Sequence, residues 1–250
     1  MKRIVYLMFF SFTLLSMEGL AQEKQETSAK ETILAEGNAK NIFDRKFRWG
    51  ISWNQYWSTI KGSNLPKTYF VKPSVGFNVR AEYYPLPFIG IGAGFGVQQR
   101  GAGILNPDNY GAPFSHPWDR PYDKDSTYRE RLRFNTFEVP VTLLLRTPKD
   151  MFKGVRLSGA AGLVFVRVSW VNTIFMSPED GYHLITVVSN DYIKNDLAYQ
   201  LSLGADINAG DACVLQLHFV YTKGTKNIYL TGPGDGRLET FGLRVGWLFY

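Results

Sequence analysis

The chain has 250 residues, a formal net charge of +6 and a single cysteine, Cys213. This length suits one barrel domain or two small domains, the lone cysteine excludes an internal disulfide, and the modest, scattered surplus of basic residues forms no nucleic-acid-binding patch. Beyond the amino-terminal segment there is no run of about 18 apolar residues, so we expect no membrane-spanning helices there.

The amino-terminal residues have the three parts of a secretory signal peptide. Lys2 and Arg3 form a basic region, Ile4–Leu15 is an apolar core, and Ala21 lies in a cleavage zone. No cysteine lies near this zone, so a lipid-anchored lipoprotein is not expected. We therefore assign residues 1–21 to a signal peptide, which a polar segment at residues 22–46 and the main domain at residues 47–250 follow.

The rest of the chain alternates large apolar residues with polar residues, charged residues or glycine, which is the period of a β-strand with two different faces. Phe47, Trp49, Ile51 and Trp53 share one face of the first strand, and such a row would be a large exposed apolar patch in a soluble protein. It suits a strand with lipid on one side and a wet lumen on the other. The alternation predicts eight strands, at Phe47–Trp57, Val75–Tyr84, Phe88–Arg100, Leu132–Arg146, Gly154–Val166, Asp196–Asn208, Ala212–Thr222 and Leu238–Tyr250.

The third predicted strand carries glycine at four positions of one face, namely Gly90, Gly92, Gly94 and Gly96. Glycine within a strand usually weakens it, because glycine has no side chain to pack. The lumen of an eight-stranded barrel is only just wide enough to be filled by side chains. We therefore expect these glycines to make space in the lumen for large side chains from other strands.

The connections between the predicted strands alternate strictly between short and long. The short ones are 85–87, 147–153 and 209–211, and the long ones are 58–68, 101–128, 169–194 and 223–237. Outer-membrane barrels have short periplasmic turns and longer extracellular loops, so both termini are expected on the periplasmic side. Ile185–Ser189 has the composition of an extramembrane hairpin strand. The parity of the fifth strand breaks at Val166–Val168, which we interpret as the end of the membrane band or a β-bulge.

These features predict an all-β fold, an eight-stranded antiparallel transmembrane β-barrel with up-and-down meander connections. We therefore assign residues 47–250 to an outer-membrane β-barrel domain and residues 22–46 to a polar periplasmic leader. The last strand, Leu238–Tyr250, is expected to pair with the first, because an open edge in lipid would leave backbone polar groups unpaired. A soluble lipocalin-like barrel with its apolar residues inside is the structural alternative. The aromatic bulk of the apolar face, the glycines on the other face and the loop asymmetry favour the membrane barrel.

Several charged residues occupy strand positions that face the lumen. We predict that they form a structural network of ion pairs: Arg80, Glu82, Glu138, Arg146, Arg156, Asp206 and Arg244. A charge buried without a partner is costly. Because an eight-stranded lumen leaves no channel, we favour such a plug over a gated pore or a proton path. Glu138 is expected to pair across the lumen with Arg80 or Arg244.

Several strand motifs resemble those of a known family. They are Gly76–Tyr84 (GFNVRAEYY), Gly92–Gly101 (GAGFGVQQRG), Phe137–Leu145 (FEVPVTLLL) and Gly204–Asp206. Over about residues 47–250 the chain resembles the PorT-like outer-membrane barrels of Bacteroidota, although Phe137 departs from the Leu or Ile of the family's motif. The resemblance implies an eight-stranded outer-membrane barrel and no single activity, and the family's namesake takes part in type IX secretion.

The carboxyl-terminal residues also resemble a known signal, the one read by the barrel-assembly machinery. Arg244, Gly246 and Phe249 have suitable spacing, and the chain departs from the pattern by ending one residue later, at Tyr250. The resemblance implies that the assembly machinery is a partner during insertion.

We find no set of residues that meets the geometric demands of catalysis. Ser115, His116 and Asp119 lie in one loop, but a catalytic triad needs a nucleophile, a base and an orienting acid within hydrogen-bond reach. His183 in another loop and His218 in the lumen are interpreted as hydrogen-bonded polar groups. No zinc or calcium spacing occurs, so we predict no catalytic residue, no metal and no cofactor.

The prediction is a non-enzymatic structural and interaction component of the outer membrane that belongs to a larger membrane complex. Its expected partners are outer-membrane lipid, the barrel-assembly machinery during insertion and other outer-membrane or periplasmic proteins, with no nucleic acid. Two alternatives stay open. One is an accessory barrel of type IX protein secretion, and the other is a lipid-modifying outer-membrane enzyme that uses a loop His and Ser.

Overall fold

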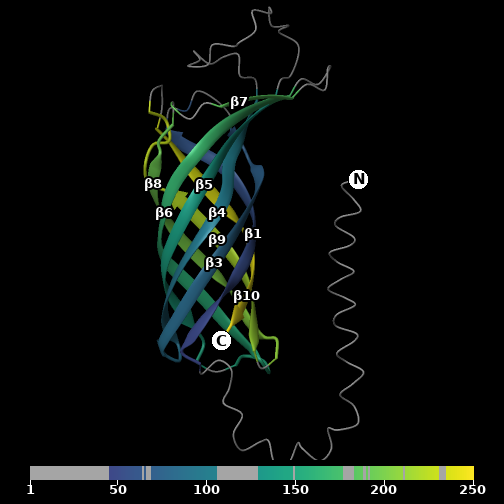
Figure 1. The fold of residues 1–250 in the computed structure, drawn as a ribbon, viewed down its shortest axis with the longest axis vertical. Helices are drawn as coiled ribbons and strands as arrows, with labels where there is room; N and C mark the ends of the chain where they lie inside the picture. Colours follow the sequence, from purple (N-terminus) through teal and green to yellow (C-terminus); the bar gives the residue numbers. More distant parts are fainter. Residues whose placement is uncertain are drawn as a thin grey trace, which may run out of the picture. The chain divides into compact units, whose positions relative to one another are not determined.

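The computed structural model describes residues 45–63, 65, 69–105, 129–148, 150–176, 183–187, 190, 192–210, 212–230 and 235–250. Its strands form a closed antiparallel barrel (Figure 1). Among the described residues, no helix is long and apolar enough to cross a membrane. The strands are β1 (Phe47–Ser63), β2 (Tyr69–Phe70), β3 (Lys72–Leu86), β4 (Ile89–Leu105), β5 (Arg129–Arg146), β6 (Val155–Met176), β7 (His183–Val187), β8 (Asn195–Asn208), β9 (Cys213–Gly224) and β10 (Asp235–Phe249).

Eight long strands make the wall, and β2 and β7 are short additions to it. Each wall strand pairs with the next one along the chain, which confirms the predicted meander. We call the end with the short connections, 87–88, 147–154 and 209–212, the lower rim, and the opposite end, which carries β7, the upper rim. The carboxyl end of β10 lies at the lower rim (Figure 1).

The barrel closes where the last strand meets the first, as predicted. The β1–β10 pairing runs from Trp49 opposite Phe249 to Ser63 opposite Asp235. The rings of Trp49 and Phe249 lie 5.6 Å apart on the outer face. Every wall strand therefore has a partner strand on each side, and such closure is the condition for a sheet to cross lipid.

The two faces of the wall have opposite character. Large apolar side chains point outward, with Trp49 48% and Leu203 70% exposed, whereas the polar side chains of Ser52 and Asn54 point inward and are fully buried. A soluble barrel keeps its apolar face inside, so this arrangement contradicts the lipocalin-like alternative. It is the arrangement of a transmembrane barrel.

The glycines of β4 make space for neighbouring side chains, as expected. A Cβ atom added at Gly96 would lie 1.6 Å from the Asn78 side-chain oxygen, and one added at Gly90 would lie 2.7 Å from the Tyr84 ring. Larger residues at these positions would therefore displace side chains that fill the lumen.

Two local predictions about strand ends need correction or resolution. A tight turn was expected at residues 84–87, but β3 continues through Pro85 to Leu86 with an irregular register, and the turn falls at Pro87–Phe88. The parity break in β6 is a β-bulge, because Thr136 pairs with Val168 while Asn135 pairs with Trp170.

The predicted hairpin strand at Ile185–Ser189 is present as β7, which pairs with the upper part of β6.

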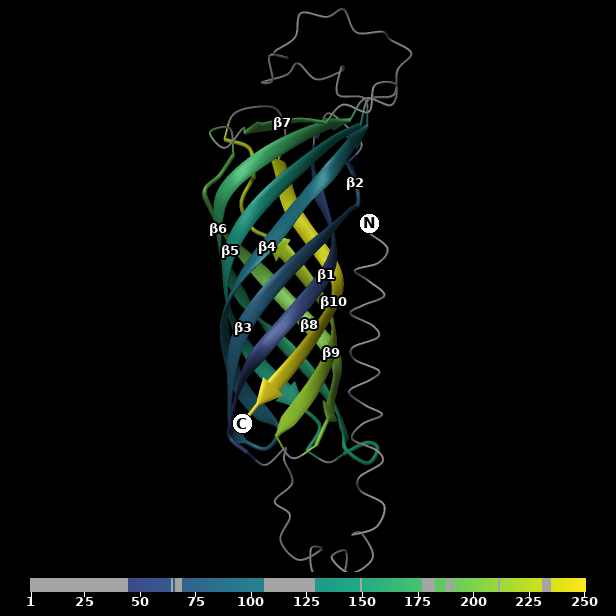
Figure 2. The ribbon, with the colours of Figure 1, turned by 45° about the vertical axis from the view of Figure 1, so that its right-hand side comes forward.

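The upper part of the wall is taller than predicted. β4, β5 and β6 continue to the upper rim beside β7 (Figure 2), and β6 ends at Met176 rather than at Val166. In this part the inner face is apolar, and a buried cluster fills the lumen: Ile60, Ala102, Leu132, Phe134, Val171, Tyr192, Ile228 and Leu238. The edge of the Phe134 ring meets the Tyr192 ring at a centroid distance of 5.1 Å.

Candidate functional site

The charged residues predicted for the lumen all lie on the inner face of the wall and are at most 8% exposed. β3 provides Arg80 and Glu82, β5 provides Glu138 and Arg146, and one residue each comes from β6, β8 and β10: Arg156, Asp206 and Arg244. Side chains alternate between the two faces of each strand, and apolar residues occupy the alternate positions that face lipid. These charged residues occupy the remaining positions and therefore point into the lumen. The contacts below show which of them are brought together.

Asp206 is the centre of the lower network and is fully buried. Its carboxylate accepts hydrogen bonds from Ser158 Oγ at 2.7 Å and Gln216 Nε2 at 3.1 Å, and it forms an ion pair with Arg48 Nη1 at 3.3 Å. These partners come from β6, β9 and β1, so one carboxylate links three other strands across the lumen. Burial of a carboxylate is tolerable only with such partners.

Glu82 forms the second centre of the lower network. Arg80 Nη2 lies 2.6 Å from Glu82 Oε1, and Gln216 Nε2 donates to the same oxygen at 3.3 Å. Arg80 Nη1 also donates to Gln216 Oε1 at 3.3 Å. Gln216 therefore joins the Glu82 and Asp206 centres into one hydrogen-bonded network.

The lower rim holds the remaining predicted arginines. Arg156 Nε lies 2.8 Å from Asp150 Oδ1. Arg146 Nε donates to the Pro87 carbonyl, and its guanidinium lies 3.9 Å from the centre of the Tyr84 ring. Both side chains thus hold turns of the lower rim against the wall.

The residues of the predicted assembly signal lie on both sides of β10. Phe249 faces outward against Trp49, Arg244 faces the lumen, and Tyr250 follows the end of β10. The Arg45 guanidinium lies 4.9 Å from the Tyr250 ring. Burial raises the pKa of the Tyr250 phenol to about 12, so this hydroxyl is neutral at physiological pH.

Glu138 has a different partner from the one predicted. It pairs with Arg100 of β4, whose Nε lies 2.7 Å from Glu138 Oε1, and not with Arg80 or Arg244. Thr136 Oγ1 donates to the same oxygen at 2.9 Å. Arg48 and Arg100 were both missing from the predicted network. The parity of β1 and β4 could have identified them, because both occupy the polar face of their strands.

Arg244 is the predicted network member with the weakest attachment. Its Nε donates to Asn54 Oδ1 at 3.2 Å, and it forms no ion pair with a carboxylate of the described residues. Together with Arg80, Gln200 and Thr142 it lines a small space of about 10 Å³ inside the lumen. A space of this size has room for about one water molecule, so the lumen is filled at this height.

His218 is a lumen residue with a serine and an acid nearby. Its Nε2 lies 2.8 Å from Ser158 Oγ and 3.4 Å from Asp206 Oδ1, so both groups meet the same ring nitrogen. A triad places the nucleophile and the acid on opposite nitrogens of the imidazole. The other nitrogen, Nδ1, faces Ser202 Oγ at the long distance of 3.4 Å.

The loop residues considered for catalysis, Ser115, His116 and Asp119, lie outside the described residues. His183 is the first residue of β7. Within the described part of the chain, no group of three or more His, Cys, Asp or Glu side chains is arranged to hold a metal ion.

A comparison with protein families agrees with this architecture. A family model described as an outer membrane protein beta-barrel domain matches residues 21–224. No protein with a curated description matches the chain. Similar solved structures include Ail, the attachment invasion locus protein of Yersinia pestis, with 15% identity and a TM-score of 0.38 over 82% of this chain and 100% of that one.

Two further solved structures have comparable similarity. A major outer membrane protein from Thermus thermophilus has 13% identity and a TM-score of 0.42 over 80% of this chain and 98% of that chain. The outer membrane protease OmpT from Escherichia coli has 12% identity and a TM-score of 0.32 over 82% of this chain and 96% of that chain.

Proposed function

We propose that this chain, which belongs to the family of outer membrane protein β-barrel domains, is a non-enzymatic structural and interaction component of the outer membrane that works within a larger membrane complex. The observation that carries the proposal is the filled lumen. Ion pairs occupy its lower part, the apolar cluster around Phe134 occupies its upper part, and a space beside Arg244 has a volume of only about 10 Å³.

A filled lumen argues against transport through the barrel and against a substrate cleft inside it. Ligand and substrate sites are usually clefts of about 300–1,000 Å³, far larger than the space beside Arg244. The buried charges therefore serve to hold the strands together. The surfaces left for a biological role are the outer wall and the two rims.

The upper wall supports an interaction role. β6 and β7 form a two-stranded extension whose pairing runs from Asn172 opposite Val187 to Met176 opposite His183. Val187 is 67% exposed on it. An exposed two-stranded extension of this kind is a suitable platform for another protein.

The orientation is part of the proposal. Short turns mark the periplasmic rim of outer-membrane barrels, so the lower rim is assigned to the periplasm and the upper rim to the cell exterior. Phe47 begins β1 and Tyr250 follows the end of β10 at the same rim, so in the proposed orientation both chain ends face the periplasm.

A narrower role is an accessory barrel of type IX secretion. The observation that favours it is the set of PorT-like strand motifs, Gly76–Tyr84, Gly92–Gly101 and Phe137–Leu145. Deletion of the gene would then leave secreted cargo in the periplasm. Normal secretion in the deletion strain would exclude this narrower role and leave the scaffold proposal in place.

Site-specific photo-crosslinking in native membranes tests the interaction role. The crosslinker is placed at three sites of matched exposure: Val187 at the upper rim, Phe152 at the lower rim and Leu203 in the lipid-facing band, which are 67%, 71% and 70% exposed. A specific partner gives a discrete protein adduct at one rim and none at Leu203.

The same experiment separates the scaffold from an enzyme. The proposal fails if neither rim forms a protein adduct while alanine at His116 changes the lipid A profile of the cells. That combination of results would favour the lipid-modifying alternative. Adduct formation at Phe152 alone would identify a periplasmic partner, and adduct formation at Val187 alone an extracellular or membrane partner.

A further inference from the structure

The hydrogen-bonded wall of the barrel is interrupted between β3 and β4. Their pairing ends at Gly76 opposite Gln98 and resumes only where Phe70 of β2 pairs with Gly103. Pro73 lies in the gap, and proline cannot donate to a strand ladder. On the β4 side, the Gly101 amide donates instead to Ser58 Oγ of β1 at 2.9 Å.

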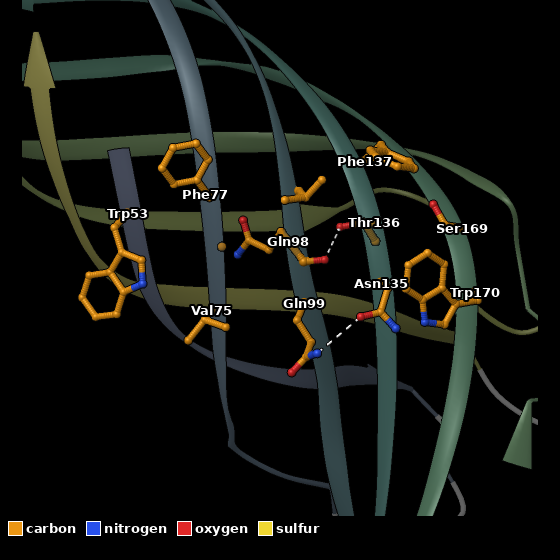
Figure 3. A pocket seen from close by; sticks show the side chains of 12 residues that line it. Trp53, Val75, Phe77, Gln98, Gln99, Asn135, Thr136, Phe137, Ser169 and Trp170 are labelled. Atoms are coloured by element: carbon orange, nitrogen blue, oxygen red, sulfur yellow. Dashed lines mark hydrogen bonds between the residues drawn. The ribbon is translucent and has the colours of Figure 1, made fainter. Parts of the chain in front are cut away.

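A groove of about 350 Å³ lies on the outer face over this interruption (Figure 3). Its volume is within the range of small-molecule sites. It crosses the wall from β1 to β6, and apolar side chains make most of its surface: Trp53, Val75, Phe77, Val97, Phe137 and Trp170. These side chains belong to the lipid-facing parity, so the groove opens toward the membrane.

One side of the groove is lined by amides instead of apolar groups. Gln99 Nε2 donates to Asn135 Oδ1 at 3.3 Å (Figure 3). Asn135 Nδ2 and Gln98 Nε2 are buried donors with no hydrogen-bond partner in the described part of the chain. Gln98 is 4% exposed, and its amide reaches from β4 toward β3 (Figure 3).

Two arginines continue the polar edge of the groove toward the upper rim. Arg133 and Arg131 follow Asn135 on the outer face of β5, at steps of about 7 Å. Neither forms an ion pair with a described residue, and Arg133 Nε is a buried donor without a partner among them. On another part of the outer face, Lys61 and Lys223 both contact Glu239, at 3.1 and 2.9 Å.

We propose that this groove binds one molecule of a phosphorylated, acylated glycolipid of the lipid A type. Its acyl chains lie along Trp53, Phe77 and Phe137, its phosphate is bound by Arg131 and Arg133, and its sugar hydroxyls accept a hydrogen bond from Asn135. Guanidinium groups bind phosphate through strong, charge-assisted hydrogen bonds. The choice of an outer-leaflet lipid rests on the proposed orientation, in which the upper rim faces the cell exterior.

Native mass spectrometry of the full barrel in detergent tests this site, with lipid A and phosphatidylglycerol as probes. The Arg131→Gln/Arg133→Gln variant is expected to lose lipid A affinity by about tenfold or more, since a phosphate contact is removed in a desolvated setting. Lys223→Gln removes an outward cation from β9, on another part of the wall, and is expected to leave lipid A affinity unchanged. Heat-modifiable mobility in gels verifies that each variant is folded.

Two results would overturn the proposal in different ways. Equal lipid A binding by the wild type and the double arginine variant would mean that lipid A associates with the apolar wall only nonspecifically. The groove would then not be a specific lipid site. Arginine-dependent binding of phosphatidylglycerol in preference to lipid A would overturn the assignment of lipid A and with it the proposed orientation. Asn135→Asp, which brings a negative charge to the phosphate, gives a second variant and is expected to weaken lipid A binding as well.

Discussion

Replacing Glu138 with leucine tests whether the lumen charges hold the barrel together. The Arg100 guanidinium pairs with Glu138 Oε1 at 2.7 Å, and the two side chains are 2% and 5% exposed. Glu138→Leu leaves Arg100 buried without its carboxylate, which costs about 3–5 kcal/mol for pairs of this kind. Arginines outnumber carboxylates among the described residues of the lumen, so no spare carboxylate can replace Glu138 as the partner of Arg100. Arg100→Leu is expected to reduce the free energy of unfolding by less, because other arginines remain in the lumen.

The assay is the free energy of unfolding in urea for the barrel reconstituted in lipid vesicles. The double variant Arg100→Leu/Glu138→Leu is expected to recover most of the lost stability, with a coupling energy of about 2 kcal/mol or more. Asp235→Leu is the control, because Asp235 pairs with Arg237 at 3.0 Å while both side chains are more than 40% exposed, and such pairs contribute about 0–1 kcal/mol. If Glu138→Leu loses no more than this control, the argument for a structural ion-pair plug is refuted.

Three further predictions concern packing and the membrane band. Gly96→Ala should destabilise the barrel by about 1–3 kcal/mol through overpacking, whereas Gly246→Ala, whose Cβ would have no neighbour closer than 3.4 Å, should be near neutral in the same unfolding assay. Phe134→Ala, in the buried upper cluster, should cost about 3–5 kcal/mol of unfolding free energy, and a smaller loss would mean that the cluster is not packed. The fluorescence of Trp53, which is 47% exposed on the outer face, should be quenched by brominated lipid, and unquenched emission would contradict a lipid-facing wall.

Strand positions in the membrane band were predictable because two different solvents act on the two faces of the wall. Lipid on one side and a crowded polar lumen on the other impose a strict period of two. The start of β1 at Phe47, the end of β5 at Arg146 and the end of β8 at Asn208 therefore agree with the prediction. The closing pair β1–β10 follows from the same argument, because lipid does not tolerate an open edge.

The upper wall was missed because its faces are reversed. Leu132 and Phe134 of β5 are inside the apolar cluster, while Arg131 and Arg133 take the outer parity. Above the lipid band, the outside of the wall meets water, and the inside becomes an ordinary apolar core. A pattern that treats apolar residues as outward no longer applies at this height. This reversal explains why the fifth strand was predicted to end at Val166, although β6 continues to Met176.

The partner of Glu138 could not be predicted from parity alone. Parity gives the face of a strand on which a side chain lies, but pairing also depends on register between strands. The residue directly opposite Glu138 on β4 is Gly96, and Arg100 lies four residues further along the same strand. Its long side chain nevertheless reaches Glu138, with Nε 2.7 Å from Glu138 Oε1. A contact between adjacent strands therefore replaces the predicted contact across the lumen.

The reversal of the faces also explains why the groove lies where it does. A strand that changes from lipid-facing to water-facing must cross the headgroup layer, where neither an apolar nor a fully hydrated surface is favoured. Gln99 and Asn135 occupy this level on β4 and β5, the ladder gap at Pro73 lies beside them, and Arg133 follows immediately above. Amides, unpaired donors and cations thus lie together at this level of β4 and β5. In the proposed complex, the phosphate and sugar of the bound lipid supply the acceptors that Arg133 Nε and Asn135 Nδ2 have not found among the described residues.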